Sequence, residues 1–87
     1  MHVMAEKTTR SIVKRSVTLH GHRTSFSIEQ PFFDEIVAAA RANGRSLAAL
    51  VSEIDETRPR EVNLSSALRL YVLERLKAER DAVRGYD

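Results

Sequence analysis

The chain has 87 residues, no cysteine and a formal net charge of +2. This length allows one domain that buries only about 60% of its unfolded surface. Without cysteine, disulfides and thiolate zinc sites are excluded, and association with another chain is the remaining ordinary source of stability. The N-terminus has no apolar run of signal-peptide or membrane-span length, so we expect a cytoplasmic protein with no membrane partner.

The charge is unevenly distributed along the chain. Residues 1–27 carry five Lys or Arg against one acidic residue, a balance of +4, whereas residues 28–87 have a balance of −2. A polyanion would therefore meet the N-terminal third, but a basic, solvated tail would have the same composition.

Residues 1–11 show no periodicity and are expected to form a flexible arm. From Ser16 to Ile28 the apolar side chains alternate with period two, which is typical of a strand, but the parity changes at Gly21. A glycine at this point predicts either a one-residue bulge or a tight turn, with Val17 and Leu19 packing separately from the second half.

The stronger half of this strand region runs from residue 23 to residue 28. Its alternation predicts that Phe26 and Ile28 face inward and that Arg23, Ser25 and Ser27 face outward.

Two short helices are predicted next. Pro31 suits the first turn of one helix, and Asn43-Gly44 supplies its C-terminal stop. Ser46 is the candidate N-cap of the other. Each helix has one apolar stripe with spacing i, i+3, i+4, i+7, formed by Phe33, Ile36, Val37 and Ala40 and by Leu47, Leu50, Val51 and Ile54.

A third helix follows a loop that contains Pro59. Asn63 can cap this helix, which is expected to run from Leu64 to about Ala82. Its first half is apolar over most of its circumference and therefore needs cover from another subunit, the apolar residues being Leu64, Ala67, Leu68, Leu70, Tyr71, Val72, Leu73 and Leu76.

A single strand region is the decisive feature of this order of elements. A lone strand cannot satisfy its own backbone donors and acceptors, so we expect it to pair with its twin across a symmetry axis. The predicted fold class is mostly α with one strand region, in an intertwined homodimer held by an intersubunit antiparallel β-ribbon.

Residues 22–56 resemble the ribbon-helix-helix superfamily, which is typified by the Arc and methionine repressors. The features that carry this resemblance are the strand Ser25-Phe26-Ser27-Ile28, the proline of the next helix and the turn Asn43-Gly44-Arg45-Ser46-Leu47. Three segments look like a bacterial subfamily that has an added C-terminal helix. They are Arg15-Ser16-Val17, Gly21-His22-Arg23-Thr24-Ser25 and Asn63-Leu64-Ser65-Ser66-Ala67-Leu68-Arg69. The expected organisation is an arm (1–11), a ribbon-helix-helix core (12–57), a linker loop (58–63) and a C-terminal helix that extends the dimer interface (64–87).

The resemblance implies a homodimer whose ribbon binds double-stranded DNA in the major groove, with strong or weak sequence specificity, and which regulates transcription near the nucleoid. It assigns Arg23, Ser25, Ser27 and, less directly, Glu29 to the base-facing side. The superfamily also implies a phosphate at the N-terminus of the second helix, near Arg45, Ser46 and Leu47, and the charge balance adds Lys14 and Arg15 as phosphate contacts. The expected dimer core consists of Phe26, Ile28, Phe33, Leu50, Val51, Ile54, Leu68 and Val72.

Several alternatives stay open. Arg23 could pair with a carboxylate of the partner subunit, and Ser46 is an N-cap that needs no ligand. His20 and His22 could bind a metal, but strand histidines more often form hydrogen bonds, so no metal or cofactor is expected. The sequence contains no catalytic motif, so we do not expect an enzyme.

The rival function is a protein-interaction module, an antitoxin-like or adaptor dimer with a protein partner on the C-terminal helix. Exposure of Leu70, Leu73 and Leu76 beside a ribbon face without positive charge would favour it.

Overall fold

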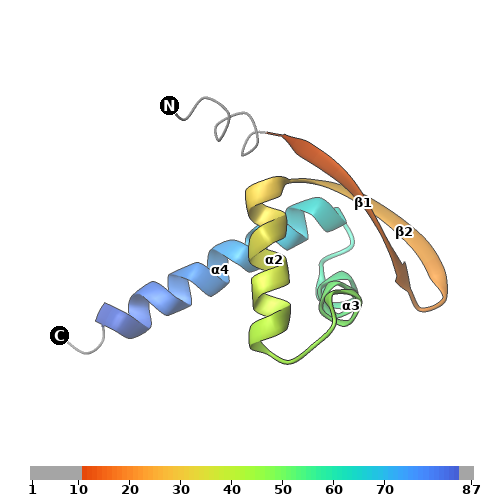
Figure 1. Ribbon diagram of the computed structural model, residues 1–87. Coiled ribbons are helices and arrows are strands. Elements are labelled where there is room, and N and C mark those ends of the chain that lie inside the picture. The colour runs from red at the N-terminus through yellow and green to blue at the C-terminus, as the bar shows by residue number, and fades with distance from the viewer. Residues whose placement is uncertain (1–10, 85–87) are drawn as a thin grey trace.

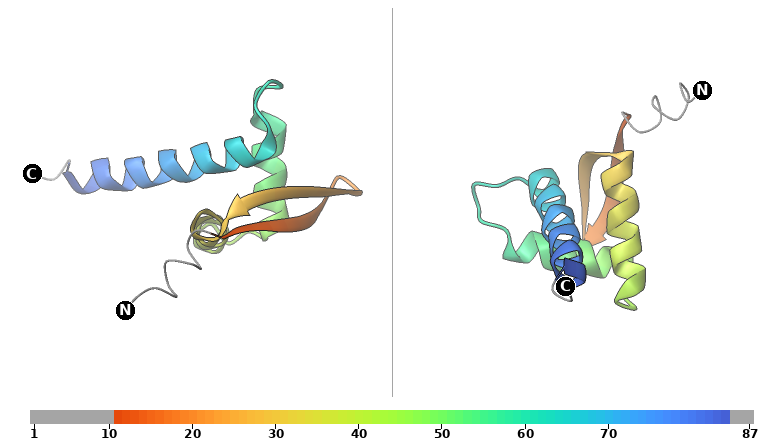
Figure 2. Two further views of the ribbon diagram at one scale, coloured as in Figure 1. Left: turned by 90° about the horizontal axis from the view of Figure 1, so that it is seen from above. Right: turned by 90° about the vertical axis from the view of Figure 1, so that its left-hand side faces the viewer.

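A computed structural model describes residues 11–84, which form a two-stranded antiparallel ribbon followed by three helices (Figure 1). The elements are β1 (Ile12–Leu19), β2 (His22–Glu29), α2 (Gln30–Ala42), α3 (Leu47–Thr57) and α4 (Leu64–Arg84). The predicted arm lies outside the described residues except for Ser11. The ribbon lies against one side of the helices, and α4 extends away from it toward the C-terminus (Figure 2).

The parity change at Gly21 is a tight turn. His20 and Gly21 have φ angles of 52° and 80°, the pair of positive values that a type I′ hairpin turn requires. The turn joins β1 to β2 in an uninterrupted register that runs from Leu19 opposite His22 to Ile12 opposite Glu29. Of the two alternatives left open by the sequence, the turn is confirmed and the bulge is wrong.

This hairpin corrects the prediction that the ribbon is made between subunits. The antiparallel ribbon is present, but both of its strands belong to one chain. The backbone groups of β1 and β2 that face each other are paired within one chain, so the pairing of these two strands does not require a second copy.

The sequence signal for this turn is weak because the first of its two central residues is unusual. A type I′ turn favours Asn, Asp or Gly at both central positions, whereas His20 carries a Cβ in the left-handed region, at a cost of about 1–2 kcal/mol. The His20 ring contacts α3, where Nε2 lies 3.1 Å from the Ser52 hydroxyl and 2.6 Å from a Glu56 carboxylate oxygen. These tertiary contacts hold the residue in a conformation that its sequence signal does not indicate.

The hydrophobic core lies between the inner face of the ribbon and the three helices. Leu19 of β1 and Phe26 and Ile28 of β2 belong to the same buried cluster, so the expectation that the two halves of the strand region pack separately was wrong. A hairpin places alternate residues of both strands on one face, and the helices cover that face. The buried helical members are Ile36, Ala39, Ala40, Leu50, Val51, Ile54, Leu64, Ala67, Leu68 and Val72.

The helix boundaries confirm the signals read from the sequence. Gly44 adopts a φ of 64° directly after the Asn43 C-cap of α2. Ser46 caps α3 by accepting a 3.0 Å hydrogen bond from the Ala49 backbone N–H. Asn63 does the same for α4, where its side-chain oxygen accepts a 2.8 Å hydrogen bond from the Ser66 backbone N–H.

The residues predicted to form a dimer core pack within one chain. Seven of the eight are at most 7% exposed, and Phe33 is partly buried. An interface with a second copy therefore has to use other side chains. On α4 the candidates are Leu70, Leu73 and Leu76, which are 52%, 48% and 43% exposed.

Candidate nucleic-acid interface

The outer face of the ribbon is a polar surface built by both strands. Seven side chains on this face are exposed, namely Ile12, Lys14, Ser16, Thr18, Arg23, Ser25 and Ser27. Their alternation with inward residues follows from the period of two in each strand. The structure thus brings the predicted base-facing residues Arg23, Ser25 and Ser27 together with Lys14, which sequence reasoning had assigned to phosphate.

The register sets these side chains in rows across the ribbon. Lys14 lies opposite Ser27, and Thr18 lies opposite Arg23. Between these rows, the hydroxyls of Ser16 and Ser25 are 3.4 Å apart. A cation therefore stands near each end of the face, on different strands, with small hydroxyl side chains between them.

Both cations on this face are unpaired. Among the described side chains, neither Lys14 nor Arg23 forms a salt bridge or a side-chain hydrogen bond. Most other described cations lie beside a carboxylate, including Arg45, Arg58, Arg69, Arg75, Lys77 and Arg80. The positive charge of the ribbon is thus available to an anionic ligand.

The comparison with protein families assigns the fold. The family model described as a ribbon-helix-helix domain matches residues 12–76, which include the ribbon, α2, α3 and the first half of α4. The chain is a ribbon-helix-helix protein. Domains of this family are generally DNA-binding transcription regulators or antitoxins, act as non-enzymatic modules and typically dimerise. No curated protein and no solved structure matches the chain.

Arg15 lies on the opposite face of this ribbon-helix-helix ribbon from Lys14. Its guanidinium stacks on the Phe33 ring, 4.1 Å from the ring centroid, and donates a 2.9 Å hydrogen bond to the side chain of Gln30. Its Nε is buried with no hydrogen-bond partner among the described residues. Lys14 and Arg15, which the sequence predicted as phosphate contacts together, therefore lie on opposite faces of the ribbon.

Glu29, at the end of β2, has a partner on α4. The Arg69 guanidinium donates hydrogen bonds of 2.8 and 3.1 Å to the two carboxylate oxygens of Glu29. These bonds, with a backbone hydrogen bond, lower the pKa of Glu29 below its ordinary value. The negative charge that would oppose a polyanion at this end of the ribbon is thus compensated.

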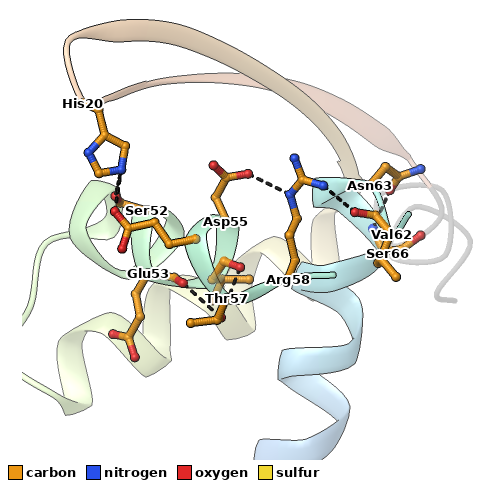
Figure 3. A network of polar contacts seen from close by, with 11 residues as sticks. His20, Ser52, Glu53, Asp55, Thr57, Arg58, Val62, Asn63 and Ser66 are labelled. Carbon is orange, nitrogen blue, oxygen red and sulfur yellow. Dashed lines mark hydrogen bonds and ion pairs between the residues drawn. The ribbon is translucent and has the colours of Figure 1, made fainter. Parts of the chain in front are cut away.

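The ribbon is held to the helices near both ends. At the turn, the His20 ring reaches Ser52 of α3 (Figure 3). Near the other end, the Ser65 hydroxyl of α4 donates a 2.7 Å hydrogen bond to the backbone carbonyl of Ser27. The carbonyl of Ser27 lies on the outer edge of β2, so these contacts brace the ribbon and leave its outer face uncovered.

The N-terminus of α3 carries the residues predicted to meet a phosphate. Ser46 is engaged as the N-cap, and Leu47 is partly buried at the first helical position. The Arg45 side chain turns along the helix, where it pairs with Glu53 and donates a 3.1 Å hydrogen bond to the Ala49 carbonyl. A phosphate at this point would compete with Glu53 for Arg45.

The structure gives the two histidines different surroundings. His20 contacts α3, whereas His22 is exposed at the start of β2. Within residues 11–84, no three His, Cys, Asp or Glu side chains gather as metal ligands would. In the same range, no helix combines the length and the hydropathy that crossing a bilayer requires.

Sequence reasoning missed the contribution of β1 to the outer face. Ser16 and Thr18 were not candidates, although the alternation from Ile12 to Leu19 was visible in the sequence. The signal that could have revealed them is the His20-Gly21 turn, because it converts that alternation into a second strand of the same ribbon.

Proposed function

We propose that the outer face of the ribbon binds the major groove of double-stranded DNA and that the protein is a bacterial transcriptional regulator. The observation that carries this proposal is the pair of unpaired cations on a solvent-exposed two-stranded ribbon. A major groove about 12 Å wide admits such a ribbon. Regulation of this kind places the protein in the cytoplasm, beside the nucleoid.

The chemistry of the face sets the expected specificity. Arg23 can donate two hydrogen bonds to guanine O6 and N7, which is the commonest specific contact in the major groove. Ser25 and Ser27 are short and discriminate less between bases. We expect one or two well-specified base pairs and a large contribution from phosphate contacts, including those proposed for Arg45, Ser46 and Leu47.

The test is a titration of labelled duplex DNA at several salt concentrations. The wild-type chain is expected to bind with an affinity that falls as salt rises, because released counterions drive the association. Arg23→Ala is expected to weaken binding to the preferred duplex by about 1–3 kcal/mol, and Lys14→Ala is expected to weaken it also.

Arg60→Ala is the matched control. Arg60 is exposed and carries no salt bridge among the described side chains, but it lies in the loop between α3 and α4. Its removal should leave the affinity nearly unchanged. Wild-type protein that binds no duplex at low salt, or an Arg60 variant that loses as much affinity as the Arg23 variant, would contradict the proposal.

A second proposal concerns α4 as a protein-binding surface. Leu70, Leu73 and Leu76 are exposed on α4, and two open apolar grooves flank the helix. Leu70 lines the groove beside Ile54 and Val62, and Leu76 lines the groove beside Pro31 and Phe32. We propose that these leucines contact another protein chain, a second copy in the first instance, so that α4 forms the interface of a homodimer.

Sedimentation equilibrium tests this surface. Wild-type protein is expected to be dimeric at tens of micromolar, and Leu73→Glu is expected to be monomeric because a buried carboxylate is costly. Ala78→Glu, an exposed position further along α4, is the control that should remain dimeric. A monomeric wild type would exclude the second copy as the occupant, and an antitoxin-like or adaptor role would then require a different protein.

A further inference from the structure

The two strands of the ribbon carry the same pattern of side chains. Residues 14–19 read Lys-Arg-Ser-Val-Thr-Leu, and residues 23–28 read Arg-Thr-Ser-Phe-Ser-Ile. Both segments have a cation first, serine third, an apolar residue fourth, a hydroxyl fifth and an apolar residue sixth. The offset between equivalent positions is nine residues.

The register of the hairpin turns this repeat into approximate two-fold symmetry. Ser16 and Ser25 are equivalent in the repeat and lie directly opposite each other. A two-fold axis through this pair, perpendicular to the ribbon, exchanges the two antiparallel strands. It relates Lys14 to Arg23 on the outer face, and Thr18 to Ser27.

The inner face obeys the same relation. The axis relates Val17 to Phe26 and Leu19 to Ile28, and all four side chains face the helices. Alternation alone explains why both strands place apolar residues inward. It does not require a cation at the first outward position of both repeated segments, residues 14–19 and 23–28, with hydroxyls at the next two.

We propose that one chain forms a complete recognition ribbon and that its DNA site is quasi-palindromic, with one half facing Arg23 and the other half facing Lys14. This inference rests on the proposed DNA binding and specifies its substrate. A ribbon built from two copies of one strand has identical halves, whereas this ribbon has two related but different halves in a single molecule.

The chemistry of the two cations makes the halves unequal. Arginine presents a planar fork that matches guanine O6 and N7, whereas lysine is a point charge with rotatable donors. The rows of Lys14 and Arg23 are four residues apart along the strands, or about 13 Å, which corresponds to about four base-pair steps. The Arg23 end of the site should therefore specify guanine more strictly than the Lys14 end.

A disulfide tests whether the ribbon belongs to one chain. The protein has no cysteine, and Ser16 and Ser25 face each other with their hydroxyls 3.4 Å apart. The double variant Ser16→Cys, Ser25→Cys is expected to oxidise to a monomer on a non-reducing gel, as a link within one chain would. A covalent dimer, or a product that stays reduced, overturns the proposal.

Selection of DNA sites from a random pool tests the unequal halves, using variants that preserve charge. Under each ribbon, wild-type protein should select guanine strongly at one end and weakly about four base pairs away. Lys14→Arg is expected to raise the weaker preference by about 5-fold to 150-fold and make the site palindromic. Arg23→Lys is expected to weaken the strong preference to the level of the other end.

The outcomes separate this inference from the function on which it rests. A homodimer would carry two ribbons, so symmetry is judged within the base pairs that one ribbon contacts. A perfect palindrome within those base pairs, or a Lys14→Arg variant that changes none of them, overturns the quasi-palindromic ribbon and leaves DNA binding intact. If wild-type protein selects no duplex while the disulfide forms within one chain, the DNA function fails and the inferred site fails with it.

Discussion

The two faces of the ribbon differ in what their side chains already contact. On the inner face, Leu19, Phe26 and Ile28 are buried against the helices, and Arg15 is stacked on an aromatic ring. On the outer face, Lys14 and Arg23 are exposed and have no partner among the described side chains. The same two strands thus stabilise the fold with one face and leave the other for a ligand.

This contrast predicts that a substitution acts on stability or on binding according to the face it alters. The inner face buries apolar side chains in the core, and truncating one of them costs several kcal/mol of stability. The outer face gains its contacts only when a ligand is present. Substitutions of the outer residues can therefore change the specificity of the ribbon with little effect on the stability of the fold.

The largest expected effect separates two isoleucines of the ribbon. Ile28→Ala should lower the free energy of unfolding by about 2–5 kcal/mol, because the side chain is fully buried. Ile12→Ala should change it by less than about 0.5 kcal/mol, because Ile12 is 61% exposed. Urea denaturation of both variants measures this difference, and similar losses at the two positions would contradict the assignment of faces.

A smaller effect is expected at the turn. Gly21→Ala should cost about 1–2 kcal/mol of stability, because the φ angle of Gly21 is 80°. An added Cβ would meet no atom within 4 Å, so the cost comes from backbone strain and not from a steric clash. Gly44→Ala is matched to it, with φ of 64° and the same open surroundings. Both should lower the urea midpoint, but only Gly21→Ala should also weaken DNA binding. If the Gly21→Ala and Gly44→Ala variants bind DNA with equal affinity, the conformation of the turn does not affect DNA binding by the ribbon.

The smallest effect concerns the pair at the end of the ribbon. The lowered pKa of Glu29 means that its carboxylate is stabilised in the folded state by Arg69. That contribution is fully present above the unfolded pKa, near 4.5, and is lost as pH falls through the lowered folded value.

Thermal unfolding measured between pH 7 and pH 3 tests this contribution. Glu29→Gln should be less stable than wild type above about pH 4.5, and the difference should shrink as pH falls below that value. Arg69→Met should remove the same pH-dependent difference. A gap between wild type and Glu29→Gln that stays constant with pH would show that Arg69 does not lower the pKa of Glu29.

Local signals predicted the helical part of the molecule well. Ser46 and Asn63 cap the helices that they were expected to begin, and Gly44 ends α2. These features depend on backbone groups within three or four residues of the cap, so neighbouring residues suffice to predict them.

The candidate site was predicted only in part. Arg23, Ser25 and Ser27 lie on the outer face as the alternation indicated, whereas Arg15 and Glu29 proved to have partners 15 and 40 residues away in the sequence. Such partners depend on how distant elements pack, and residue type alone does not reveal them. The same holds for His20, whose positive φ is accompanied by contacts with α3.

By itself the sequence determined the three helices, the strand alternation, the polar outer residues of β2 and the family, because these follow from periodicity, capping and local motifs. Only the tertiary structure decided that the ribbon is a hairpin within one chain. The backbone groups of a strand can be paired by the same strand of a second copy or by a neighbouring strand of the same chain. The residue pattern does not distinguish these two partners, because both satisfy the same backbone donors and acceptors. The unpaired cations and the approximate two-fold relation between β1 and β2 became visible once that choice was known.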